Sequence, residues 1–165
     1  MFPTQVNVVP AVGVAGDFAS SNPRNSVVNG PGAFVAGAAG VTVGLFAWAD
    51  AATNRLVLNT GTGVPTGFVH RSQQALITTY LAEGSNVIPS GMPVTLFSAG
   101  EFWVVNNGAA ATVVGMSAYA NLTTGVVSFL TTGTLAVAGT IATKWYALSV
   151  GAIGELVKMS SHALG

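Results

Sequence analysis

Few residues in this chain are of types that do chemistry, and their spacing does not bring them together. There are two histidines, His70 and His162, and no cysteine. A zinc site needs about three or four nitrogen, sulfur or carboxylate ligands that converge on one point. The five acidic residues are dispersed, so no carboxylate pair for acid–base catalysis can be identified from spacing: Asp17, Asp50, Glu83, Glu101 and Glu155. The sequence therefore predicts no metal site.

Motifs for nucleophilic catalysis or for phosphate binding are also missing. The chain contains no Gly-x-Ser-x-Gly motif, which would place a serine on a strand-to-helix turn. The glycine-rich stretch GTGVPTG (residues 61–67) lacks the Gly-Lys-Ser/Thr ending of a phosphate-binding loop, and no helical pattern follows it. We therefore expect a protein that is not an enzyme and that binds no cofactor.

Charged side chains are unusually scarce for a chain of 165 residues. They make up 6% of it, against about 25% in an ordinary soluble domain. Lysine plus arginine number five, equal to aspartate plus glutamate, so the formal net charge is zero. This rules out the basic stripe that binding to nucleic acid requires. A free monomer relies on a charged surface for solubility, so the composition indicates a surface that largely faces other protein.

A membrane partner is not expected either, although half of the residues are hydrophobic. The longest stretch without a charge, residues 102–143, is interrupted throughout by Asn, Ser, Thr and Gly. A spanning helix needs about 20 mostly apolar residues. The first ten residues, MFPTQVNVVP, lack the basic start and the cleavage site of a signal peptide. We therefore expect synthesis in the cytoplasm.

The elements that would position any functional residue are strands. Short β-branched or aromatic runs recur about every 8 to 12 residues from Val41 onward, separated by Gly, Asn or Pro. This spacing predicts an all-β domain, an antiparallel sandwich or barrel. Asn107-Gly108 predicts a hairpin, and a second turn is predicted from Asn121 to Gly125. The predicted strands are 41–48, 55–59, 68–70, 93–97, 101–106, 111–119, 125–130, 134–143, 144–150 and 155–159.

Two segments leave alternatives open. Residues 1–32 hold four of the seven prolines and no helical period, so they form either a loose terminus or an extended N-terminal arm ahead of a β domain at 33–165. Apolar residues along this segment favour the arm. Residues 72–84 fit one helical face but are also good strand material, and we favour a strand. Each of the three tryptophans fits either the core or an interface: Trp48, Trp103 and Trp145.

Several longer segments, taken in order, resemble one protein family. They are GDFASSNPRNSVVNGPGAFVAG (16–37), GVTVGLFAWAD (40–50), TGFVHRSQQALITTYLAEG (66–84), VIPSGMPVTLFSAGEFWVV (87–105) and AYANLTTGVVSF (118–129). Together they resemble the structural cement, or decoration, proteins of tailed bacteriophage heads. The resemblance runs from about residue 10 to about residue 130, and the last 35 residues resemble the family less clearly.

This resemblance implies a β-rich, non-enzymatic protein on the outer surface of the virion capsid. Its partners would be the major capsid protein and itself, as a homodimer or homotrimer, and it would tie neighbouring shell subunits together. The residues we expect at such interfaces are Asp17, Phe18, Pro23, Arg24, His70, Arg71 and Trp103. Two other functions stay open, namely a tail or baseplate β-barrel and a β-sandwich module that binds a ligand or carbohydrate.

Overall fold

The computed structural model describes residues 12–30, 32–53, 55–72, 80 and 85–162, and within them every regular element is a β-strand. The largest sheet has six strands in the order β1-β8-β6-β4-β5-β2. Their bounds are Asn25–Ser26 (β1), Val35–Ala36 (β2), Phe46–Ala49 (β4), Leu56–Leu58 (β5), Gly67–Val69 (β6) and Leu96–Ala99 (β8).

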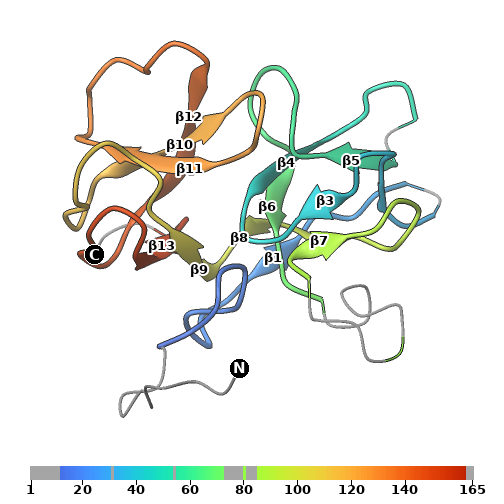
Figure 1. The fold of residues 1–165 in the computed structure, drawn as a ribbon, viewed down its shortest axis with the longest axis horizontal. Coiled ribbons are helices and arrows are strands. Elements are labelled where there is room, and N and C mark those ends of the chain that lie inside the picture. Colours follow the sequence, from blue (N-terminus) through green and yellow to red (C-terminus); the bar gives the residue numbers. More distant parts are fainter. Residues whose placement is uncertain (1–11, 31, 54, 73–79, 81–84, 163–165) are drawn as a thin grey trace, which may run out of the picture.

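A second sheet has five strands in the order β11-β10-β12-β13-β9, all antiparallel. Its strands are Glu101–Val105 (β9), Ser117–Asn121 (β10), Val127–Leu130 (β11), Thr140–Ala147 (β12) and Leu156–Ser160 (β13). The remaining pair, Val41–Thr42 (β3) with Val87–Ile88 (β7), lies beside the six-stranded sheet (Figure 1). Neither large sheet closes on itself, so the expected all-β, mainly antiparallel fold is confirmed as a sandwich rather than a barrel. The one parallel pair in the described residues joins β2 to β5.

The predicted turn after Asn121 is confirmed as the hairpin between β10 and β11. The N–H of Gly125 donates to the carbonyl oxygen of Asn121 at 2.8 Å. Gly125 has a φ of 69°, a left-handed conformation that glycine adopts without a steric penalty. The Asn121 side chain accepts from the N–H groups of Thr123 and Thr124. The hydrogen bonds that close the turn lie within a few residues, so a local pattern was sufficient to predict it, although the N–H groups of Phe46 and Gly61 also donate to carbonyl oxygens of the turn.

The predicted hairpin at Asn107-Gly108 is wrong, because β9 pairs with β13 and not with the strand that follows it. The buried Asn106 explains the difference. Its Nδ2 donates to the carbonyl oxygens of Ala110 and Ala152, and its Oδ1 accepts from Gly108. These bonds hold residues 106–110 as a loop that is fixed to a distant part of the chain.

The predicted strands at 134–143 and 144–150 are also different in the structure. One strand, β12, spans Thr140–Ala147, while residues 131–139 form an exposed loop. Glycine at 133 and 139 brackets that loop. The ambiguous segment 72–84 lies outside the described residues, apart from Ser72 and Tyr80.

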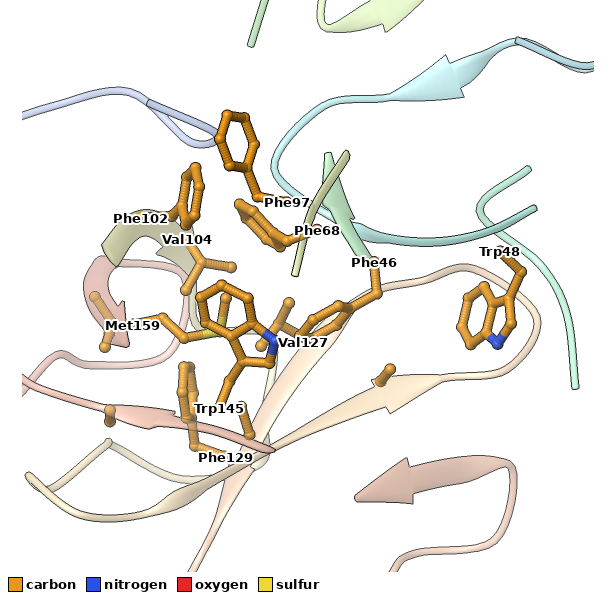
Figure 2. Close-up of a cluster of buried hydrophobic side chains, with 14 residues drawn as sticks. Phe46, Trp48, Phe68, Phe97, Phe102, Val104, Val127, Phe129, Trp145 and Met159 are labelled. Atoms are coloured by element: carbon orange, nitrogen blue, oxygen red, sulfur yellow. The ribbon is translucent and has the colours of Figure 1, made fainter. Parts of the chain in front are cut away.

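Aromatic rings from both large sheets meet in one buried cluster, which Figure 2 shows. Phe68 lies at its centre, with ring centroids 5.0 Å from Phe102, 5.6 Å from Phe46 and 6.1 Å from Trp145. A second cluster of Val, Ala, Phe, Ile and Leu fills the space between the six-stranded sheet and the β3–β7 pair. Trp48 and Trp145 are core residues, and only Trp103 keeps a partly exposed side chain.

Candidate interaction surface

The N-terminal segment Gly16–Ser26, called the clasp from here on, extends the five-stranded sheet by pairing with β9. The N–H of Gly16 donates to the carbonyl oxygen of Trp103 at 2.8 Å, and the N–H of Trp103 donates to that of Asp17 at 2.9 Å. One step further, the N–H of Ala19 donates to the carbonyl oxygen of Glu101 at 3.0 Å. Residues 16–19 thus cover the edge of β9 that would otherwise be unpaired.

The same clasp continues onto the six-stranded sheet. Its last residues form β1, in which Asn25 and Ser26 pair with Ala99 and Phe97 of β8. Between β8 and β9 stands Gly100 with a φ of 141°, and a Cβ there would come within 2.9 Å of the Phe102 ring. The chain bends at this glycine from one sheet into the other. Because the clasp follows both strands, it joins the two sheets along their shared edge.

Phe18 holds the clasp in place because its ring stacks between the Arg24 guanidinium and the His70 imidazole. The Arg24 guanidinium carbon lies 3.9 Å from the Phe18 ring centroid, and the His70 ring centroid lies 4.1 Å from it at an interplanar angle of 22°. Two groups this close to one centroid must occupy opposite faces of the ring. The edge of Phe18 also contacts Phe97 and Phe102, at 5.4 and 5.2 Å between centroids. Such aromatic and cation–π contacts add to the burial of the ring.

His70 connects the core to the clasp through a hydrogen bond. Its Nδ1 lies 2.9 Å from the carbonyl oxygen of Gly16, which also accepts from the N–H of Arg71 at 3.1 Å. Burial lowers the pKa of His70 below its ordinary value, and the nearby charge of Arg24 acts in the same direction. The bond to Gly16 and the charge of Asp17 oppose this shift without cancelling it. The fold therefore favours the neutral ring, with Nδ1 as the donor.

Glu101 ties the clasp to β13 through its carboxylate. The side chain is 7% exposed, and its Oε1 accepts from Nδ2 of Asn22 at 2.8 Å. Its Oε2 lies 3.7 Å from Nζ of Lys158. Burial opposes ionisation, but hydrogen bonds from Ser20 and Asn22, together with the charge of Lys158, hold the pKa of Glu101 below its usual value. The ionised carboxylate is thus part of the closed clasp.

All seven residues that the sequence singled out lie at the clasp. Four belong to it. Of the other three, two directly follow β6 and the third lies on β9. Phe18, His70 and Trp103 are partly buried by contacts within the chain, whereas Pro23 and Arg24 remain exposed. Pro23 accepts a hydrogen bond from Nε2 of His162 at 2.8 Å when that nitrogen carries the proton. The set is Asp17, Phe18, Pro23, Arg24, His70, Arg71 and Trp103.

The neutral state of His70 predicts a loss of stability in mild acid. Between the folded and the unfolded pKa the unfolded chain binds more protons at this site, so stability falls as the pH drops below 6.5, the ordinary pKa of histidine. In His70→Phe, which keeps a ring against Phe18, this part of the pH dependence should disappear. The part due to Glu101 should remain, because its stabilisation is lost only as the pH falls below 4.5. Melting temperatures from about pH 8 to about pH 3 cover both windows, and equal slopes near pH 6 in the two proteins would contradict the assignment.

A second surface of interest was missed by sequence reasoning. It consists of apolar side chains on two neighbouring loops, 109–116 and 148–154, which a backbone bond from the N–H of Thr112 to the carbonyl oxygen of Gly151 holds together at 2.8 Å. These side chains are 50% to 69% exposed. They are Val113, Val114, Val150 and Ile153, and we call them the valine surface. The sequence predicts strands at 111–119 and 144–150, but β10 begins only at Ser117 and β12 ends at Ala147.

The loop at 131–139 adjoins the valine surface. The hydroxyl of Thr132 donates to the carbonyl oxygen of Gly115 at 2.8 Å, directly after Val114. Every residue of this loop is exposed, and Leu135 reaches 89%. The three loops project from the gold to red half of the molecule, at the left of Figure 1, and we call them the apolar loops. The signal in the sequence was the lack of any charge between residues 102 and 143.

Two other kinds of feature are absent from the described residues. No three of their His, Asp or Glu side chains are grouped so that they could hold a metal ion. Within the same ranges, no helix is long and apolar enough to cross a membrane.

Comparison with known proteins points to one group. A family model described as XM1 gp53 minor capsid protein matches residues 2–161. A chain in a solved structure titled "The capsid of Myoviridae Phage XM1" has the same fold, with a TM-score of 0.68. The two chains are 18% identical, and the match covers 97% of this chain and 96% of the other. No curated protein matches the chain.

Proposed function

Since the chain belongs to the XM1 gp53 minor capsid protein family, it is a structural component of a bacteriophage capsid, and we propose that it acts there as a cement protein. In this role it binds the outer surface of the shell and ties neighbouring major capsid subunits together, without catalysing a reaction. It does so as a small homo-oligomer, a dimer or a trimer. The resemblance of the ordered segments from residue 16 to residue 129 to cement proteins supports this assignment.

The observation that carries the proposal is the exposed, uncharged character of the apolar loops. Large aliphatic side chains gather on three loops that are linked by hydrogen bonds, in a stretch with hardly any charge. Contiguous apolar surface of this kind marks protein–protein contact in soluble proteins. Interface cores are likewise depleted in charged residues. In the proposed role, the apolar loops form the main contact with the shell.

The exposed residues of the clasp supply a polar contact beside it. Arg24 is exposed although its guanidinium stacks on Phe18, so its outward N–H groups are available to carboxylates of a neighbouring subunit. A guanidinium recognises carboxylates in a bidentate manner. Arg71 is held by the side chain of Asn86 through a 2.8 Å hydrogen bond and contributes with its remaining donors.

The clasp also changes what can be proposed for the N-terminal arm. We keep the division into an N-terminal segment at 1–32 and a β domain at 33–165, but residues 16–26 pair with β8 and β9 of the same chain. The part that reaches a neighbouring subunit is therefore the stretch ahead of Val12. The clasp fixes the position on the β domain to which this stretch is attached.

The proposal is tested by the stability of DNA-filled heads. Heads produced without this protein should release their DNA at a lower temperature than complete heads, and addition of the purified protein should restore the difference. Restoration is expected because non-covalent links between capsomers oppose the pressure of the packaged DNA. A release temperature that is the same with and without the protein would contradict the cement role, and binding to isolated tails instead of heads would favour the tail alternative.

A further inference from the structure

A groove of about 340 Å³ opens between the two large sheets. Its lining includes Phe46 from β4, Val64 and Pro65 from the loop before β6, and Ala142, Lys144 and Trp145 from β12. Phe46 and Trp145 also belong to the aromatic core, which Figure 2 shows. Their ring centroids are 6.3 Å apart. The groove therefore reaches down to the core of the sandwich, and its chemistry is that of an apolar slot with a single positive charge in its lining.

One side of the groove is a strand with an incompletely paired edge. β13 pairs with β12 only at Tyr146 and Ala147. After Ser160 the chain turns away, and the N–H of Ser161 donates to the carbonyl oxygen of Gly100 at 3.1 Å. In the described part of the chain, no strand continues this pairing along Thr140–Trp145. An extended segment can bind such an edge through main-chain hydrogen bonds and place alternate side chains in the adjoining groove.

We propose that this groove receives residues 1–11 of a second copy of the chain, an inference that rests on the proposed oligomeric cement role. The sequence of this stretch, MFPTQVNVVPA, carries no charged side chain, so its burial leaves no charged side chain unpaired. Val6 and Val8 alternate around Asn7, which puts both valines on one face of an extended segment. That face fits the slot above Phe46 and Trp145.

The direction in which the chain leaves the clasp favours a second copy over the same copy. Gly13 lies so close to the Trp103 indole that a Cβ there would overlap it. Trp103 follows the buried Phe102 and precedes the buried Val104, so its side chain is on the outer face of the five-stranded sheet. The groove opens between the sheets, on the inner face. The described chain therefore reaches Val12 beside the outer face, on the opposite side of the sheet from its own groove.

The chain contains no cysteine, so disulfide cross-linking provides a clean test. Full-length Val8→Cys is mixed with full-length Ala142→Cys under mild oxidation, and the products are separated without reductant. Ala142 is exposed in the lining, so cysteine is tolerated there. We expect a covalent dimer that contains one copy of each variant. The matched control mixes Val8→Cys with Leu135→Cys, whose exposed position on an apolar loop is outside the groove, and should give only background dimer.

Three results would overturn the inference. The first is a dimer yield no greater than in the control. The second is an internal cross-link in the Val8→Cys/Ala142→Cys double variant with no product between copies. The third is cross-linking of Ala142→Cys, on heads, to a different capsid protein in place of a second copy.

Head binding separates this inference from the proposed function. Ala142→Glu introduces a negative charge into the groove and should abolish binding of the second copy's segment. The assay mixes Val8→Cys with the double variant Ala142→Glu/Thr143→Cys, and the cross-link between the two cysteines should be lost. If wild-type protein stabilises heads but no cross-link between copies forms, the groove inference fails and the cement role stands. If the cross-link forms but heads are equally stable without the protein, the cement role fails and the groove inference stands.

Discussion

Replacing Phe102 by alanine is expected to lower the free energy of unfolding by about 3–5 kcal/mol, the usual cost of removing a buried phenylalanine ring. Phe102 lies between the inter-sheet core and the clasp. Its ring contacts Phe68 and Trp145 in the inter-sheet core, and it also contacts Phe18 of the clasp. The substitution therefore leaves a cavity that borders both the inter-sheet core and the clasp. Urea unfolding, followed through tryptophan fluorescence, measures the loss.

Leu135→Ala serves as the matched control, because this leucine is almost fully exposed. Its free energy of unfolding should stay within about 0.5 kcal/mol of the wild-type value, as for other surface substitutions. A loss below about 1 kcal/mol for Phe102→Ala, on the same scale, would mean that the rings near the clasp do not form one core with those between the sheets.

Replacing Ile153 by aspartate should weaken binding to heads at least about thirtyfold, which corresponds to the roughly 2 kcal/mol loss typical of an interface hot spot. The side chain is exposed on the valine surface, so a carboxylate there is solvated in the free protein but buried in the proposed contact. The fold should be unchanged. Co-sedimentation of labelled protein with heads that lack it gives the affinity, and circular dichroism confirms folding.

The control for this variant is Val28→Asp, which places the same charge on a more exposed apolar residue that follows β1 of the six-stranded sheet. Its affinity for heads should remain close to that of the wild type. Equal weakening by both variants would indicate a non-specific effect of charge, and no weakening by Ile153→Asp would remove the valine surface from the proposed shell contact.

Local patterns in the sequence were reliable where the stabilising contacts were themselves local. The turn at Asn121–Gly125 depends on an asparagine side chain and one glycine, both inside the turn. At Asn107-Gly108 the same kind of signal was wrong, because Asn106 bonds to Ala152, far along the chain. The two cases differ in where the asparagine side chain bonds, which is within the turn for Asn121 and partly to a distant residue for Asn106.

The candidate site likewise combines features that the sequence predicted with features that only the structure revealed. The resemblance to cement proteins picked out residues at the clasp, but no local pattern could reveal that Phe18, Arg24 and His70 form one stack. The valine surface escaped prediction because Val113 and Val114 have the composition of a buried strand. They are exposed since β10 begins only at Ser117, and the loop before it is held outward by its bond to Gly151.

The sequence alone determined the all-β class, the lack of any metal or catalytic motif, and a charge content far below that of an ordinary soluble domain. These are properties of composition and short-range periodicity, which do not depend on how strands pair. The tertiary structure decided the strand order, the clasp that joins the two sheets, the exposed apolar loops and the groove beside β12. Each of these depends on contacts between residues that are distant in the chain. Such contacts form only after the strands have paired, because the pairing decides which side chains face each other and which remain exposed.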